Sequence, residues 1–191
     1  MEKQVLSASE ALERLKDGNR DYIGAASSFG DISPEIRRRA FEEGQNPYAV
    51  IVTCSDSRVI PESIFSAGIG ELFVIRVAGN VIDRHQLGSI EYAADHLDTR
   101  LVVVLGHSRC GAVGAAIGGN SDGYIKFITE EIQKAIAGEK DEFRACCLNV
   151  QRSVSVIREK LKLSDGDGEM GLKVCGAMYH TDTGEVEFLE G

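Results

Sequence analysis

The stretch that decides the fold is YAVIVTCSDSRV, residues 48–59, where an apolar run gives way at once to polar and charged side chains. The run is too short for a helix and rich in β-branched residues, which predicts a buried strand. Similar runs follow, ELFVIRV at 71–77, RLVVVLGH at 100–107 and LKVCGAMY at 172–179. The first three are nearly continuous in apolar residues, as expected of parallel strands covered on both faces.

Helical patterns separate the predicted strands. HQLGSIEYAADHL at 85–97 has apolar residues on one side, and two longer helices are predicted at 122–137 and 141–162. A turn then leads to EVEFL, 185–189, which can pair antiparallel with the fourth strand. The predicted fold class is therefore α/β, with an open, mostly parallel sheet of about four strands, an antiparallel edge strand and helices on both faces.

The N-terminal part is predicted to be a helical arm. A capping box that begins at Ser7 opens one helix, and Pro34 opens a second. No internal repeat, low-complexity tract or linker divides the chain. We therefore expect one domain over residues 1–191, with the helical arm at 1–45 and the α/β core at 46–191.

Composition excludes several classes of protein. The net charge of -9 argues against a nucleic-acid binder, which usually carries a basic face. No apolar run approaches the roughly 20 residues of a membrane span, and the charged N-terminus is unlike a signal peptide. Five cysteines in a chain without an export signal favour thiols or metal ligands over disulfides. The expected location is the cytoplasm.

Two short motifs fall at the same edge of the predicted sheet. Cys54 ends the first strand, and His107 and Cys110 follow the third. Ligands of open α/β sheets bind at the carboxyl ends of the strands, so these three side chains are expected to meet. Two thiolates and one imidazole suit zinc, and the fourth position is open or filled by Asp56, as in a catalytic site. The remaining cysteines have no suitable neighbours and are assigned to packing: Cys146, Cys147 and Cys175.

The motifs CSDSRV at 54–59 and GHSRCGAV at 106–113 together resemble the β class of carbonic anhydrases, zinc enzymes that interconvert carbon dioxide and bicarbonate. The segments GQNPYAVIVTCSDSRVIPE, ELFVIRVAGN, GSIEYAADHL and LVVVLGHSRCGAV are similar to family segments in the same order. The resemblance covers roughly residues 5–190, nearly the whole chain.

The resemblance implies a role for individual residues. Cys54, His107 and Cys110 match the zinc ligands, and Asp56 with Arg58 matches the carboxylate–guanidinium pair of the family. Further matches fall on the substrate pocket of the plant-like branch: Gln45, Phe73, Ala78, Tyr92 and Gly111. Ala78 stands where the family has a pocket valine, which puts the width of the pocket and the turnover in question.

The implied reaction is the reversible hydration of carbon dioxide to bicarbonate and a proton, by attack of a zinc-bound hydroxide. Asp56 has two alternative roles: paired with Arg58 it orients the hydroxide, and as a fourth zinc ligand it closes the site. The proton shuttle is left open among His85, His96 and His180. The resemblance also implies a homodimer or homotetramer, in which Gln45 of one chain faces Phe73 and Tyr92 of the other.

Two other functions remain as alternatives. The same fold and zinc site could hydrolyse carbon disulfide or carbonyl sulfide, as close relatives of the family do. The chain could also be an inactive zinc-binding regulatory protein, although such a protein has no use for Asp56, Arg58 and Gln45.

Overall fold

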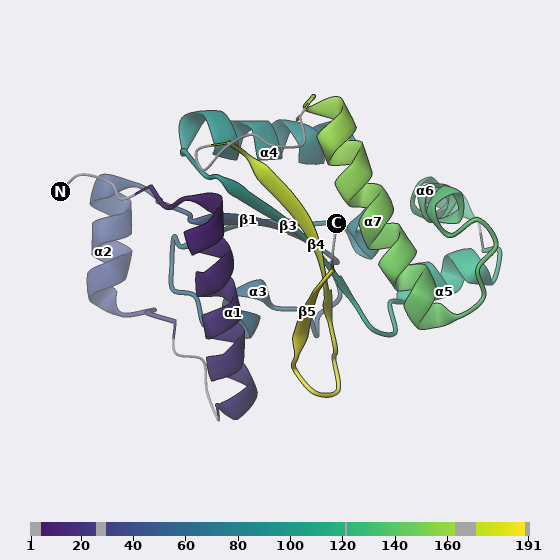
Figure 1. The fold of residues 1–191 in the computed structure, drawn as a ribbon, viewed down its shortest axis with the longest axis horizontal. Helices are drawn as coiled ribbons and strands as arrows, with labels where there is room; N and C mark the ends of the chain where they lie inside the picture. Colours follow the sequence, from purple (N-terminus) through teal and green to yellow (C-terminus); the bar gives the residue numbers. More distant parts are fainter. Residues whose placement is uncertain (1–4, 26–29, 121, 163–170, 190–191) are drawn as a thin grey trace.

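A computed structural model describes residues 5–25, 30–120, 122–162 and 171–189. Its centre is a five-stranded sheet in the order β2-β1-β3-β4-β5 (Figure 1). Neighbouring strands pair in parallel except β4 and β5, which pair antiparallel. The predicted fold class, including the antiparallel edge strand, is confirmed. The strands are β1 (Ala49–Thr53), β2 (Leu72–Arg76), β3 (Leu101–His107), β4 (Lys173–Tyr179) and β5 (Val186–Leu189).

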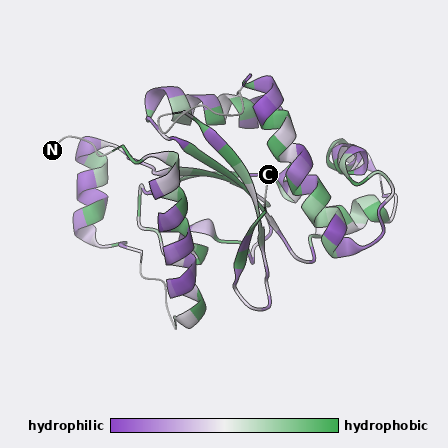
Figure 2. Cartoon of the chain, viewed as in Figure 1, coloured by the Kyte–Doolittle hydropathy of each residue, from purple (hydrophilic) through white to green (hydrophobic). Residues whose placement is uncertain are grey.

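The two central strands are buried on both faces. Every residue of β1 and β3 is buried, as their continuous apolar sequence predicts. Side chains alternate between the faces, so Val50 and Val102 pack in one cluster while Ile51 and Val103 pack in the other. Figure 2 shows this core as hydrophobic strands flanked by helices with hydrophilic outer surfaces. Both faces of the sheet therefore need a covering layer.

Helices supply that layer on both faces. One cluster joins the sheet to α1 (Ala8–Gly24) and α3 (Pro61–Ile64). The other joins it to four helices: α4 (Arg84–His96), α5 (Gly111–Ile117), α6 (Lys126–Ile136) and α7 (Glu142–Lys160). The helices predicted at 85–97, 122–137 and 141–162 are thus present with small differences at their ends, whereas α3 and α5 were not predicted.

The N-terminal arm contains two helices with different environments. The capping box at Ser7 is present, and α1 buries Leu15 completely against its own sheet. By contrast, α2 (Pro34–Glu43) buries none of its residues, and Phe41 is 90% exposed. Figure 1 shows α2 at the margin of the molecule, away from the sheet. The parts of the predicted arm at 1–4 and 26–29 lie outside the described residues.

None of the helices in the described ranges is both long enough and apolar enough to cross a membrane.

Candidate metal centre

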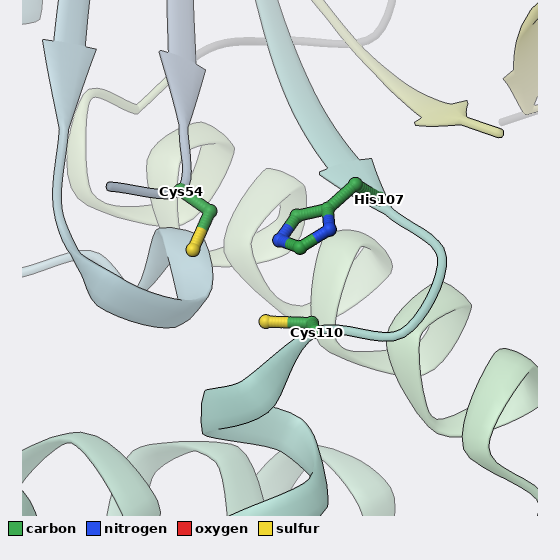
Figure 3. Close-up of side chains that lie close together, drawn as sticks. All are labelled: Cys54, His107 and Cys110. Atoms are coloured by element: carbon green, nitrogen blue, oxygen red, sulfur yellow. The ribbon is translucent and has the colours of Figure 1, made fainter. Parts of the chain in front are cut away.

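Three side chains converge at the carboxyl end of the sheet (Figure 3). Cys54 follows β1, His107 is the last residue of the neighbouring β3, and Cys110 directly precedes α5. One ligand atom from each lies within 4.8 Å of the other two, and all three residues are buried. The spatial cluster expected from the sequence is therefore present.

The imidazole of His107 is oriented with one nitrogen toward the cluster. Its Nδ1 lies 3.0 Å from the carbonyl oxygen of Ser108, which can only accept, so Nδ1 carries the proton. The buried Nε2 then presents a lone pair, and it has no hydrogen-bond partner among the described residues. A lone pair fixed by a backbone contact on the other nitrogen is the usual state of a metal-binding histidine.

The two thiols are coupled by a contact between them. The hydrogen bond from the Cys110 thiol lowers the pKa of Cys54 to about 4, and the same contact raises the pKa of Cys110. A cation placed between them would favour ionisation of both, because thiolates are the metal-binding form.

The residues present fit a zinc ion. Two sulfur donors and one nitrogen donor form a set that zinc prefers over harder cations. The orphaned Nε2 of His107, which is buried at a cost unless it has a partner, would gain one. Three protein ligands rather than four also leave one position for an exchangeable group.

Asp56 lies beside this cluster and is held by Arg58. Its Oδ1 accepts from the Arg58 backbone N–H and Nε, both at 2.9 Å, and its Oδ2 accepts from Nη2 at 2.8 Å. These bonds from Arg58 hold the pKa of the Asp56 carboxyl well below its usual range. Oδ2 is also 3.9 Å from Nε2 of His107. An ionised acceptor therefore lies at the edge of the cluster of three candidate metal ligands, called the metal cluster below.

The comparisons with known proteins agree with this geometry. A family model described as carbonic anhydrase matches residues 49–186, which contain all of these residues. Carbonic anhydrase 2 of Mycobacterium tuberculosis is 35% identical, over 92% of this chain and 90% of its own length. The carbonic anhydrase of Mycolicibacterium smegmatis is 36% identical, over 93% and 91%. The chain belongs to the β-carbonic anhydrase family. The resemblance found in the sequence is thus confirmed.

Solved structures of β-carbonic anhydrases share the fold. One from Aspergillus fumigatus superimposes with a TM-score of 0.66 and 25% identity, over 82% of this chain and 86% of that one. A second structure comes from a study of two tetrameric β-carbonic anhydrases of Sordaria macrospora. It gives a TM-score of 0.69 with 22% identity, over 96% and 95% of the two chains.

The residues matched to the family's substrate pocket fall into two groups. Ala78 and Gly111 lie near the metal cluster, next to Gly79 and Cys110. Phe73 pairs with Val50, which lies four residues before Cys54. At about 3.3 Å per residue, Phe73 is therefore roughly 13 Å from Cys54 along the strand direction.

Tyr92 and Gln45 lie with Phe73 rather than with the metal cluster. The rings of Tyr92 and Phe73 are 6.2 Å apart, and Tyr92 is 47% exposed. The Cα of Gln45 lies beside Gly70, at the amino end of β1. One chain therefore does not bring all five pocket residues around its own metal cluster.

Sequence reasoning missed two groups that contact the candidate metal ligand Cys54. Arg76, at the end of β2, donates from Nε to the Cys54 carbonyl at 3.2 Å and from Nη2 to the Asp56 carbonyl at 2.7 Å. Gly79 donates its backbone N–H to Cys54 Sγ at 3.2 Å. Both residues lie in the segment RVAGN, and the sequence shows that this segment follows a predicted strand. The contact of the segment with Cys54, however, depends on the pairing of β1 with β2.

The remaining cysteines and histidines lie outside the cluster. Burial raises the pKa of both Cys146 and Cys175 to about 11, which agrees with their assignment to packing. Two of the histidines that were considered as proton shuttles contact aromatic rings instead. His96 lies beside Tyr92, and His180 stacks on Phe143.

Proposed function

We propose that this protein catalyses the reversible hydration of carbon dioxide to bicarbonate and a proton, with a zinc ion held by Cys54, His107 and Cys110. The observation that carries the proposal is the buried cluster of two thiols and one imidazole lone pair in a member of the carbonic anhydrase family. Zinc in such a site lowers the pKa of a coordinated water, which makes a nucleophile available near neutral pH.

Asp56 and Arg58 are proposed to orient that water. Arg58 keeps the carboxylate ionised and directed by its two side-chain bonds, so Oδ2 is available as an acceptor on the side of His107. A water between Oδ2 and the three ligands would donate a hydrogen bond to the carboxylate, and its lone pair would point away from Asp56. The contact with Arg58 supports this role for Asp56 over the role of fourth ligand, because a carboxylate bound to zinc would have to leave the guanidinium.

The substrate pocket is proposed to form between two copies of the chain. Gln45, Phe73 and Tyr92 gather at one end of the sheet, so the backbone favours one copy supplying all three to the metal site of the other. This arrangement differs from the one implied by the resemblance, in which Gln45 and the two rings come from different chains. The exposed helix α2 and the exposed ring of Tyr92 provide surface for such contact.

Mixed oligomers test this arrangement. Cys54→Ser removes a metal ligand and Tyr92→Ala removes a pocket wall, and each variant alone is expected to be weakly active. When the two are mixed during refolding, a metal site in a Tyr92→Ala chain would receive an intact wall from its Cys54→Ser partner. Activity above the sum of the separate variants is the expected result. Activity equal to that sum, or an active monomer of about 21 kDa by light scattering, would contradict a shared pocket.

A stopped-flow assay of carbon dioxide hydration, run beside a sulfide-release assay with carbonyl sulfide and carbon disulfide, tests the reaction itself. We expect fast hydration and little sulfide release. The reverse pattern would move the assignment to hydrolysis of the sulfur compounds. A zinc-loaded protein inactive in both assays would favour the regulatory alternative.

We further propose that the protein works in the cytoplasm as a homodimer or a homotetramer. All five cysteines lie in the described residues and none forms a disulfide, which fits a reducing compartment.

A further inference from the structure

Helix α7 reaches the metal cluster through the backbone of a short loop. The loop is the 3-10 turn η1 (Ala78–Asn80) that follows β2. On one side, Gly79 donates its N–H to Sγ of Cys54 at 3.2 Å. On the other side, the Gly79 carbonyl accepts from Nδ2 of Asn149, in the middle of α7, at 2.7 Å. Asn149 is thereby connected to a candidate metal ligand through a single glycine.

The backbone conformation and the close neighbours of Gly79 leave room only for glycine at this position. Its φ of 69° lies in the left-handed region, which glycine adopts at least cost. A Cβ there would lie 2.7 Å from Cδ1 of Ile132 and 3.0 Å from Cβ of Ala112, so α5 and α6 close over the loop. Glycine is also the most freely rotating residue, so the direction of its N–H depends on what holds its neighbouring peptide groups.

Asn149 is suited to hold one of those groups. Its side chain is buried, with 3% of the residue exposed, and an amide donor buried at that depth is costly unless it is bonded. One turn further along α7, the Ser153 hydroxyl donates to the carbonyl of Asn80 at 3.0 Å. Two successive carbonyls of the loop are thus fixed by polar side chains on an otherwise apolar face of the helix.

We propose that Asn149 is a positioning residue for the metal ligand Cys54: by fixing the Gly79 carbonyl, it aims the Gly79 N–H at the sulfur. The proposal rests on the zinc site proposed above. An N–H bond to a thiolate draws electron density from the sulfur, so the sulfur gives less charge to the metal and the ligand keeps one orientation. Asn149 lies 95 residues beyond Cys54 and outside every motif that the sequence analysis used.

The test uses two substitutions that break the bond and one that does not. Asn149→Asp keeps the shape and replaces the donor by an acceptor, and Asn149→Ala removes the donor altogether. The matched control is Val154→Ala, which truncates a buried side chain on the same helix where it faces Gly176 of β4. Folding of each purified full-length variant is checked by circular dichroism, and Asn149→Ala decides the outcome if Asn149→Asp does not fold.

Two measurements on metal-loaded protein distinguish positioning from general stability. The first is the rate at which zinc passes to a coloured chelator, expected to rise about tenfold in the Asn149 variants, in line with the loss of other outer-shell contacts. The second is the thiolate-to-cobalt charge-transfer band of the cobalt-substituted protein. Loss of the N–H bond raises the energy of the sulfur lone pairs, so the band should move to longer wavelength. Val154→Ala should change neither.

The outcomes separate this proposal from the proposed function. If wild-type protein shows no thiolate-to-cobalt band, the metal site itself is wrong. If wild type shows the band and both Asn149 variants match it in band position and in zinc transfer, the metal site stands and the positioning role is refuted. Equal changes in Val154→Ala and the Asn149 variants would likewise refute it, because they would report stability alone.

Discussion

Substituting Gly79 by alanine should destabilise the fold by an amount that can be worked out from its surroundings. An L-residue in the left-handed region costs about 1–2 kcal/mol. Alanine also lowers the conformational entropy of the unfolded chain, which offsets about 0.4–1 kcal/mol of that cost. The new Cβ would also lie 2.7 Å from Cδ1 of Ile132 and 3.0 Å from Cβ of Ala112, and overpacking of this kind costs about 1–3 kcal/mol. The expected loss is about 2–4 kcal/mol in the free energy of unfolding.

Gly119 provides the matched control. Its φ of 76° is similarly left-handed, but a Cβ there would meet nothing within 4 Å. Gly119→Ala should therefore cost only the backbone strain, about 1 kcal/mol. Both variants are unfolded in urea as metal-free protein at one fixed concentration, so that neither metal affinity nor association enters the comparison. If Gly79→Ala were no more destabilising than Gly119→Ala, the predicted clash of a Cβ at Gly79 with Ile132 and Ala112 would be refuted.

Two further predictions concern charge. Arg58→Ala removes the two side-chain bonds that orient Asp56. The variant should therefore keep its zinc but hydrate carbon dioxide roughly tenfold more slowly, as expected for the loss of an outer-shell contact. Arg58→Lys keeps the charge without the two-pronged contact, so its hydration rate should lie between the rates of Arg58→Ala and wild type. An Arg58→Ala enzyme with the wild-type rate would refute the orienting role. Burial raises the pKa of Tyr48 above its unfolded value of about 10. The contribution of Tyr48 to the free energy of unfolding is therefore fully present below pH 10 and decreases above it, where the phenol ionises in the unfolded chain. Urea unfolding at pH 9 and pH 11 should show a smaller loss in Tyr48→Phe than in wild type, and an equal loss would contradict this account.

The strands and the metal cluster could be predicted because each follows from a local pattern. Continuous β-branched runs such as the one ending at Thr53 fit only a strand covered on both faces. The rule that parallel strands present their carboxyl ends at one edge then brings Cys54 next to His107 without any knowledge of distances. The pairing of Asp56 with Arg58 was implied by the family resemblance of the same motif, and their contact is local in the chain.

What could not be predicted depends on contacts between distant segments. Helix α5 contains Gly111 and Gly114, has no side-chain cap and is held instead by packing of Val113 and Ala116, so propensity alone argues against it. The position of Phe73 far from its own metal cluster follows from the register of β1 with β2, which the sequence does not specify. Asn149 gives no signal in the sequence, because a single buried asparagine in an apolar helix is recognisable only once Gly79 is seen beneath it.

The central claim, that zinc on Cys54, His107 and Cys110 serves carbon dioxide hydration beside Asp56, is tested most directly by zinc content and hydration rate measured together on three proteins. Wild type should bind about one zinc per chain and be active. Cys54→Ser should lose most of both, since only two strong ligands remain. Asp56→Ala should keep its zinc and lose activity across about pH 6–9, the range that brackets titration of a zinc-bound water. A Cys54→Ser protein that keeps full zinc and activity, or an Asp56→Ala protein with an unchanged hydration rate, would contradict the account.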